Sequence, residues 1–271
     1  MVSPVPVVGA TVTVPSVPGY LRDVYEWAYL NPSNAARLDH EQVVSVILWG
    51  NQRRLKRAAY DEFRPGQRVL QAAHVYGDFI PGLARRLGAK GRLEVVDIAP
   101  LQVARCRDKL CAYPWTQVRH ADARDPGGGP YDGVCCYFLL HELPGVWKRA
   151  VVDALLANVA PAGKVVFVDY HKPRRWNPLK PVMSVVFDRF EPFAKELWHH
   201  DVRQLASRPA DFSWCKDTYF GGLYQKVVAR PLVARPGAAR GWRGALDRAG
   251  GNFAYPQRAE GGACTAGREG A

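Results

Sequence analysis

The segment from Arg68 to Asp78 constrains the fold of this chain more than any other. Pro65-Gly66 breaks the chain just before it, and the apolar pair Val69-Leu70 begins it. Gly77 is followed by apolar residues at helical spacing, namely Ile80, Leu83, Ala84 and Leu87. The segment therefore predicts a strand, a tight turn and a helix, which is how a parallel sheet presents a cofactor loop.

The same alternation continues along the chain. The predicted strands are 69–72, 92–97, 117–119, 131–139, 164–170 and 222–229. Helices are predicted between them at 79–87, 100–113 and 146–159, with another from about Asp201. Strands separated by helices form right-handed βαβ units. We therefore expect an α/β fold with a mostly parallel, twisted sheet and helices on both faces.

Two helices are expected before the first strand. An aromatic helix at 20–29 should end at Asn31-Pro32, because the residue before a proline disfavours helical geometry. A longer helix should run from Asp39, as its N-cap, to Tyr60, with an apolar stripe and a basic face. Together they predict a helical lid beside the sheet.

These patterns divide the chain into parts. Residues 1–19 are proline-rich, carry no Lys or Arg, and are expected to be a flexible lead-in rather than a targeting peptide. The helical region is 20–64, and the α/β domain is 65–234, with an insertion at 171–200. Residues 235–271 are rich in Gly, Ala and Arg, so a disordered basic tail is expected there.

Composition narrows the partners and the compartment. The formal net charge of +12 favours an acidic partner, an anionic membrane surface or a nucleic acid. The six cysteines form no Cys-x-x-Cys pair and no zinc spacing, which indicates a reducing, cytoplasmic setting. No apolar run has the length that a bilayer-spanning helix needs.

Two aspartates follow predicted strands where an adenosine would bind. Asp97 ends the second strand, 20 residues after Gly77, and its carboxylate can accept both ribose hydroxyls. The alternative is a helix N-cap. Asp122, in Ala121-Asp122-Ala123 after the third strand, can accept the adenine amino group. A turn-forming aspartate is the alternative there.

A second group of polar residues follows the fourth and fifth strands, on the edge that faces the ligand crevice in such sheets. His141-Glu142 can bind a metal or move protons, or can be a solvated loop pair. Asp169, Tyr170 and His171 end the fifth strand, and His171 is a second candidate ligand or base.

The insertion contains an amphipathic stretch from Trp176 to Trp198. One interpretation is a helical cap on the core. The other is an apolar cover that receives a lipid-like substrate at a membrane surface. The cations that flank it, Lys172, Arg174, Arg175 and Lys180, fit the second interpretation.

Over about residues 65–230 the chain resembles class I S-adenosylmethionine (SAM) methyltransferases. The order of strands and helices, Asp97, Asp122 and the Pro161-Ala162-Gly163 turn carry the resemblance. It implies a Rossmann-like fold that binds SAM. The first loop of those enzymes reads apolar-apolar-acidic-x-Gly-x-Gly-x-Gly. Here the corresponding residues are Gln71, Ala73, Val75 and Gly77. The cofactor-binding residues implied are Gln71, Ala73, Gly77, Asp97, Asp122 and Ala123.

Five blocks, at 47–51, 69–79, 138–142, 167–171 and 191–193, resemble more narrowly the methyltransferase-like proteins of rhodoquinone biosynthesis, the RquA family. This resemblance implies conversion of ubiquinone to rhodoquinone, in which an amino group from SAM replaces a methoxy group with Mn2+ assisting. We expect Gln71, His141 and Tyr25 to be catalytic. His141 and Glu142 are expected to hold the metal, which would polarise the quinone carbonyl as a Lewis acid.

Gln71 gives this chemistry a physical rationale. A carboxylate at that position would raise the pKa of the methionine ammonium, and an ammonium has no lone pair with which to attack a quinone. A neutral glutamine can hold the amine without keeping it protonated.

Two alternatives remain at this stage. The first is a conventional methyltransferase on a quinone or small lipid. The second is a non-catalytic protein of this fold that binds RNA or a partner through basic residues. The scattered Lys and Arg make a nucleic-acid partner unexpected. We expect ubiquinone as the substrate and a peripheral location at the inner face of a membrane.

Overall fold

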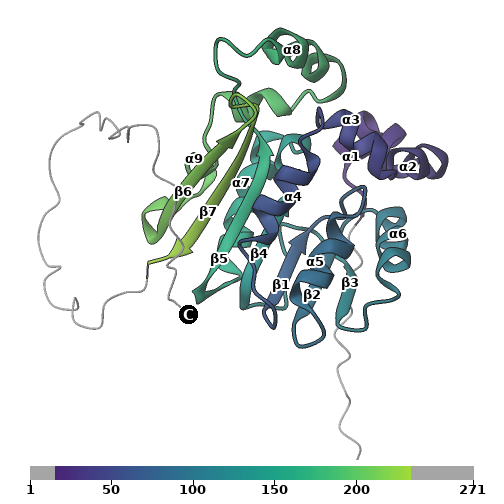
Figure 1. The fold of residues 1–271 in the computed structure, drawn as a ribbon, viewed down its shortest axis with the longest axis vertical. Helices are drawn as coiled ribbons and strands as arrows, with labels where there is room; N and C mark the ends of the chain where they lie inside the picture. The colour runs from purple at the N-terminus through teal and green to yellow at the C-terminus, as the bar shows by residue number, and fades with distance from the viewer. Residues whose placement is uncertain (1–15, 233–271) are drawn as a thin grey trace, which may run out of the picture. The chain divides into compact units, whose positions relative to one another are not determined.

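A seven-stranded sheet runs through the part of the chain that the computed structural model describes, residues 16–232 (Figure 1). Its strands are β1 (Arg68–Ala72), β2 (Arg92–Asp97), β3 (Thr116–His120), β4 (Tyr131–Tyr137), β5 (Val159–Tyr170), β6 (Phe212–Tyr219) and β7 (Tyr224–Pro231). Their order is β3-β2-β1-β4-β5-β7-β6. The first five are parallel, and β7 is antiparallel to both neighbours. The predicted mostly parallel α/β fold is confirmed.

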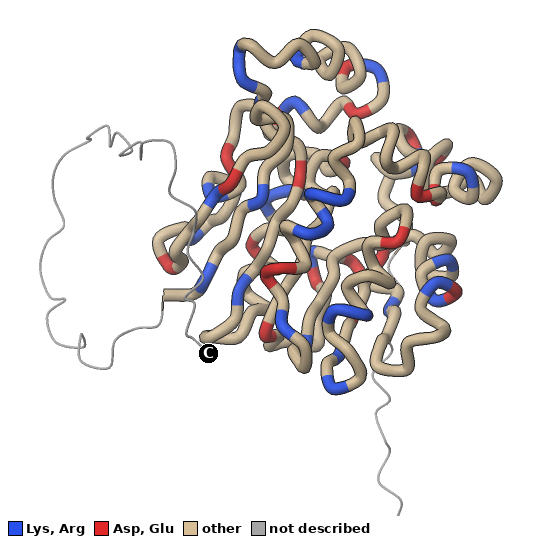
Figure 2. The backbone as a smooth tube through the Cα atoms, in the orientation of Figure 1, with Lys and Arg blue, Asp and Glu red and all other residues tan. Residues whose placement is uncertain are grey.

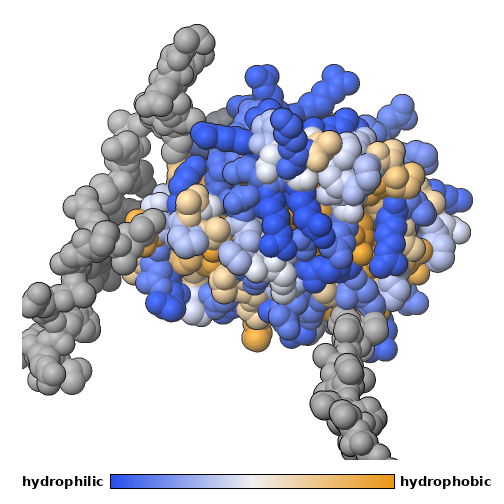
Figure 3. All heavy atoms as spheres, turned by 90° about the horizontal axis from the view of Figure 1, so that it is seen from below, coloured by the Kyte–Doolittle hydropathy of each residue, from blue (hydrophilic) through white to orange (hydrophobic). Residues whose placement is uncertain are grey.

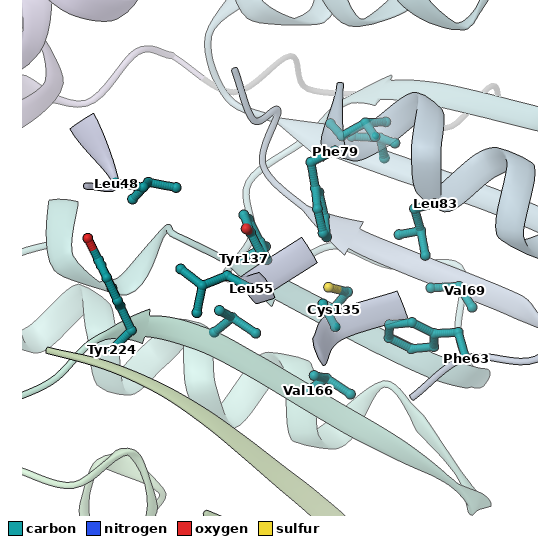
Figure 4. Close-up of a cluster of buried hydrophobic side chains, with 14 of the residues drawn as sticks. Leu48, Leu55, Phe63, Val69, Phe79, Leu83, Cys135, Tyr137, Val166 and Tyr224 are labelled. Carbon is teal, nitrogen blue, oxygen red and sulfur yellow. The ribbon is translucent and has the colours of Figure 1, made fainter. Parts of the chain in front are cut away.

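Helices cover both faces of this sheet because its strand residues alternate between two apolar clusters. One face packs on α4 (Gln52–Tyr60), α5 (Phe79–Leu87) and α6 (Pro100–Leu110), through Val69, Cys135 and Val166 of the strands. Figure 4 shows this cluster, in which Leu55 of α4 and Phe79 of α5 lie among strand residues such as Tyr137 and Cys135. The other face packs on α7 (Gly145–Ala157) and α9 (Val202–Leu205), through Leu70 and Phe167.

The edge strand β6 was not predicted. Its burial alternates between half-buried and exposed residues, and it carries Ser213, Lys216 and Asp217, so its sequence lacks the apolar run of a central strand. The strand forms because β7 offers it a ladder, which pairs Phe212 with Pro231 at one end and Tyr219 with Tyr224 at the other.

The long helix predicted from Asp39 to Tyr60 is wrong. The structure has α3 (Glu41–Ile47), a break, and then α4. Trp49 and Gly50 in the break have φ of 51° and 73°, a left-handed conformation that ends a helix. Sequence periodicity could not reveal the break because the apolar stripe continues through it.

The segment before Asp39 also differs from its prediction. Helix α1 (Gly19–Tyr25) continues into a π-helical turn, η1 (Glu26–Leu30). Asn31-Pro32 ends this unit as expected but also begins another helix, α2 (Pro32–Leu38). The Asn31 side chain accepts hydrogen bonds from the Ser33 and Asn34 amides, both at 3.1 Å, and proline suits the first helical position.

Asp39 is not the N-cap of α3, where His40 stands. Its carboxylate, only 5% exposed, accepts hydrogen bonds from the Gly77 amide at 2.9 Å, from Arg105 at 2.7 Å and from Lys109. Lys109 also donates to the Gly77 carbonyl at 2.8 Å. The lid is thus fastened to the loop after β1 by a buried carboxylate.

The insertion is helical as expected. It contains α8 (Leu179–Phe190) and the 3-10 turn η3 (Ala194–Trp198), which pack on the core through Met183, Phe187 and Leu197. The remaining short turns are η2 (Leu140–Glu142) and η4 (Pro209–Asp211). Within 16–232, no helix has the length and apolarity to cross a bilayer. The predicted tail, and the lead-in up to residue 15, lie outside the described residues.

We expect Asp39→Ala to lower the free energy of unfolding by about 3 kcal/mol, since it strands two partly buried cations. The measurement is urea unfolding followed by circular dichroism. As a control, Asp188→Ala removes an aspartate that is 65% exposed and paired with Lys195, and should cost less than about 1 kcal/mol. Equal losses in the two variants would contradict the clamp.

Candidate functional site

A cavity of about 590 Å³ lies at the carboxyl ends of β1 to β4. Four of the predicted cofactor-binding residues line it: Ala73, Asp97, Asp122 and Ala123. They come from three different strand ends, and the parallel order β3-β2-β1 brings those ends together. Its other walls include Tyr20, Tyr29, His74, Gln102, Glu142 and Trp147. We call this the first cavity.

Asp97 lines the first cavity, as its predicted ribose role requires, but it is not the N-cap of α6, a position that Ala99 holds. Its carboxylate accepts hydrogen bonds from the His74 amide at 2.7 Å and from the Ala99 amide at 2.8 Å, which fixes the turn after β2. Burial raises its pKa to about 6, although these amides act in the opposite direction. Each oxygen keeps a lone pair that a ligand in the first cavity can use.

Asp122 forms a turn, which was the alternative to its predicted role in binding the adenine amino group. One oxygen accepts a hydrogen bond from the Arg124 amide at 2.8 Å, and the other pairs with the Arg124 guanidinium at 2.7 Å. That guanidinium lies 3.4 Å from the centre of the Trp147 ring. Asp122 and Trp147 both line the first cavity, so this end offers a carboxylate beside an aromatic surface.

Gln71 does not line the first cavity or the one described next. It is fully buried, and its amide nitrogen donates to the carbonyls of Ala72 at 2.8 Å and Ala73 at 3.0 Å. A glutamate could not donate these bonds, which explains a neutral side chain here by structure alone. The position does not support the predicted contact with a cofactor amine.

The other two loop residues are constrained by the backbone. Ala73 has φ of 66°, a left-handed conformation that glycine adopts with less strain. Gly77, at φ of 78°, lies under the lid rather than in the first cavity, and a Cβ there would stand 2.9 Å from Glu41 Oε2. Its predicted role in cofactor binding is therefore indirect, through the shape of the loop.

A second cavity, of about 780 Å³, adjoins the first. Tyr29, His74 and Glu142 line both, so the two meet at these three side chains. Most of the second cavity's wall is aromatic or aliphatic, with His141, Glu142 and Glu191 as its charged groups. Its apolar residues include Trp27, Val44, Ile47, Leu48, Tyr76, Tyr137, Phe138 and Tyr170.

His141 is held by a carboxylate from the neighbouring strand. Its Nδ1 lies 2.9 Å from Asp169 Oδ1, and Asp169 is 1% exposed. Burial lowers the pKa of the imidazole, but the Asp169 charge raises it more, to about 9. His141 is therefore a cation and a hydrogen-bond donor at neutral pH.

Two glutamates share this environment. Glu142 Oε1 lies 3.8 Å from His141 Nε2 and accepts a hydrogen bond from Tyr29. Burial raises its pKa to about 8, and burial likewise raises the pKa of Glu191. Tyr25, predicted as catalytic, lies outside both cavities and donates to Glu191 at 2.7 Å. Tyr25 therefore positions Glu191. Glu191 entered the sequence predictions only within the block 191–193, which resembles the RquA family.

His74 was missed as a site residue. Gln102 donates through its amide nitrogen to the Tyr29 carbonyl at 2.8 Å, so its oxygen faces His74 Nδ1, also at 2.8 Å. Nδ1 is then the protonated nitrogen, and Nε2 is an acceptor. Burial lowers the pKa of His74 to about 4, so this side chain is neutral at the junction of the two cavities. A histidine between loop positions carries no sequence signal of such a role.

The predicted manganese site does not fit the arrangement. No group of three or more His, Cys, Asp or Glu side chains suited to a metal ion exists among residues 16–232. His141 uses Nδ1 for Asp169, and the glutamates bind tyrosines. His171, the second candidate, points elsewhere, with Nδ1 at 2.8 Å from the Gly222 carbonyl. We derive no step through a metal.

Comparisons with known proteins bear on the fold. No family model and no curated protein matches this chain. A possible exported protein from Bordetella parapertussis matches in structure, with a TM-score of 0.51, 16% identity and coverage of 71% of this chain and 70% of that one.

Two methyltransferases have the same TM-score, 0.51. The putative O-methyltransferase from Nostoc punctiforme is 17% identical, over 66% of this chain and 56% of its own. The O-methyltransferase family protein from Burkholderia thailandensis is 14% identical, over 73% and 62%. None of the three is described as a rhodoquinone-biosynthesis protein. At such identities the likeness concerns the fold, which is the Rossmann-like fold of class I SAM-dependent methyltransferases.

Ala73→Gly should stabilise the protein. It removes a left-handed alanine, a strain of about 1–2 kcal/mol, against a chain-entropy cost of about 0.5–1 kcal/mol. We expect the free energy of unfolding in urea to rise by up to about 1 kcal/mol. The neighbouring Ala72→Gly, in the extended strand β1, should lower it, and a loss in both variants would mean that Ala73 is not strained.

Proposed function

We propose that this protein is a SAM-dependent transferase that acts on a quinone. The observation that carries the proposal is the meeting of two unlike cavities at Tyr29, His74 and Glu142. One is placed where proteins of this fold hold their cofactor, and the other has aromatic walls and a small set of polar groups. A transferred group would cross at the junction.

The first cavity fits the adenosine part of SAM. Asp97 would accept the ribose hydroxyls, and the Asp122 end, with the Trp147 ring, would receive the adenine. The backbone around Ala73 would approach the methionine part. When bound, SAM supplies the group to be transferred.

The second cavity fits a quinone better than a phenol. A quinone ring is a flat apolar disk with carbonyl acceptors, and this cavity has aromatic walls with donors, since His141 is a cation and Glu142 is largely protonated at neutral pH. A donor on the carbonyl oxygen makes the ring more electrophilic. Of the three described side chains at the junction only His74 carries a nitrogen, and burial lowers its pKa to about 4, so it is a weak base toward a phenol.

This electrostatic pattern favours attack of a nucleophile on the quinone ring. It supports the conversion of ubiquinone to rhodoquinone. The amine nitrogen of SAM would add to the ring carbon that bears a methoxy group, and the methoxy group would leave as methanol. Elimination of a Cβ proton and the Cα–N bond of the cofactor would then leave the amino group on the ring. Conventional methylation of a quinone or small lipid is the alternative, and the O-methyltransferases of the same fold favour it. In either case His141 would hold a proton toward the substrate oxygen while Asp169 keeps the imidazole charged and oriented.

Mass spectrometry separates the two reactions. The protein is incubated with SAM and, in separate reactions, with a short-chain ubiquinone or a short-chain hydroxyquinone, because ubiquinone has no free hydroxyl to methylate. Replacement of methoxy by amino lowers the product mass, whereas methylation raises it. We expect the lower mass, and a product of higher mass would establish the alternative. If SAM binds but no product of either mass forms, quinones are excluded as the substrate class.

SAM affinity should depend on the ionisation of Asp97. Because its pKa is about 6 and ribose hydroxyls bind the carboxylate form, affinity should fall as the pH drops below about 6. Asp97→Asn should weaken binding by about 1–3 kcal/mol and flatten this dependence. Calorimetry from pH 5 to 8 tests it. Asp108→Asn, an exposed change on α6, is the control, and a variant of Asp97 that binds normally would remove the ribose assignment.

Turnover should require protonated His141. His141→Gln should lower kcat by about 100-fold or more while SAM affinity stays unchanged. Wild-type activity should fall as the pH rises through about 9, and Asp169→Asn should move this limb to lower pH by removing the charge that keeps the imidazole protonated. His171→Gln, outside both cavities, is the matched control. If the alkaline limb of the pH–activity profile does not move in Asp169→Asn, a group other than His141 titrates there.

A further inference from the structure

Large apolar side chains lie exposed on elements next to the second cavity. They are Trp27, Val46, Ile47, Trp49, Val182, Val185 and Phe190, and we call this set the apolar rim. They come from η1 and α3, which line the cavity, from the α3–α4 break, and from α8, which ends beside the cavity residue Glu191. Helices α3 and α8 lie at the same end of the described chain in Figure 1.

A ring contact joins the two parts of the apolar rim that are farthest apart in the sequence, residues 27–49 and 182–190. The rings of Trp27 and Phe190 are 6.4 Å apart, in an edge contact that joins η1 to α8. On α8, Val182 and Val185 share an exposed face at helical spacing, while Met183 and Phe187 are buried against the core. Phe190 lies on the same side as Met183 and Phe187 but is exposed at the last residue of the helix. The helix therefore uses one face for packing and leaves the other uncovered.

The apolar rim opens directly into the second cavity. Trp27 and Ile47 line that cavity and are also 45% and 47% exposed. A ligand leaving the cavity between them meets apolar surface rather than a polar collar. This arrangement suits a molecule whose apolar tail stays outside while its ring is bound within.

Cations stand beside the apolar rim. Lys172, Arg175 and Lys180 line a cleft at the start of α8, and the one carboxylate in that cleft, Asp201, pairs with Lys216. Figure 2 shows basic positions on the segment that leads into α8. The face at the opposite end, seen in Figure 3, is largely hydrophilic. Apolar side chains next to cations are the pattern of a surface that binds anionic bilayers.

We propose that the apolar rim and its cations dock on an anionic lipid bilayer, from which a lipid substrate passes into the second cavity. This inference extends the proposed function, because it names the source of the quinone. The apolar side chains would enter the headgroup boundary, and the cations would face lipid phosphates. The second cavity would then open toward the bilayer.

The test is co-sedimentation of the full chain with vesicles of phosphatidylcholine containing phosphatidylglycerol. The variant Val46→Asp/Val185→Asp changes two exposed side chains, 76% and 68% accessible, so it should fold normally. We expect its partition to fall at least about tenfold, since it removes two apolar contacts and adds two repelled charges. Leu232→Asp, 58% exposed at the end of β7, is the matched control and should bind as the wild type does. All three proteins keep the same tail, so a difference reports on the apolar rim.

Equal partition of the double variant and the wild type would overturn the proposal. So would a change from dimer to monomer in the double variant with vesicle binding unaltered, because the apolar rim would then be an interface between copies of this chain. Calorimetry with SAM tests the proposed function separately from docking on a bilayer. Failure of the wild type to bind SAM would remove the transferase while the vesicle result stands.

Discussion

The contact of Asp39 with the loop after β1 holds the site together. This carboxylate joins the lid to Gly77, Arg105 and Lys109, and so fixes where η1 lies over the strand ends. Tyr29 of η1 then stands between the two cavities and donates to Glu142. Without that fastening the first and second cavities would share one open cleft, because the sheet itself provides only the strand ends.

Burial sets the chemistry at that junction. Burial lowers the pKa of His74, which keeps it neutral, and raises the pKa of Glu142, which favours its protonated form. His141 stays charged because the Asp169 charge outweighs the effect of burial. Two histidines near one another thus differ by several pKa units because only one has a carboxylate on Nδ1. The result is an acceptor at the junction and donors on the wall of the second cavity, an arrangement suited to a carbonyl group.

The core of the fold was predictable from sequence because buried parallel strands leave apolar runs of strand length, and β1, β2, β4 and β5 have them. Asp97 and Asp122, which line the first cavity, were predictable as candidates because they stand at or just after the ends of the predicted strands β2 and β3. The half-exposed β6 was not, because it lacks an apolar run and forms on the ladder that β7 offers. The break at Trp49 was not, because the apolar stripe continues through it. Gln71 misled because its bonds to the Ala72 and Ala73 carbonyls are local contacts in the core that the loop motif does not indicate.

The sequence by itself determined the order of the parallel strands with the helices between them, and the side chains at the carboxyl edge of the sheet, because both follow from local periodicity. Only the tertiary structure decided which of those side chains act together. It paired His141 with Asp169 and placed His74 between the cavities. It also brought Tyr25 into hydrogen-bond contact with Glu191, which lies 166 residues away in the sequence. Such pairings depend on burial and on distances through space, and these come into being only when the chain has packed.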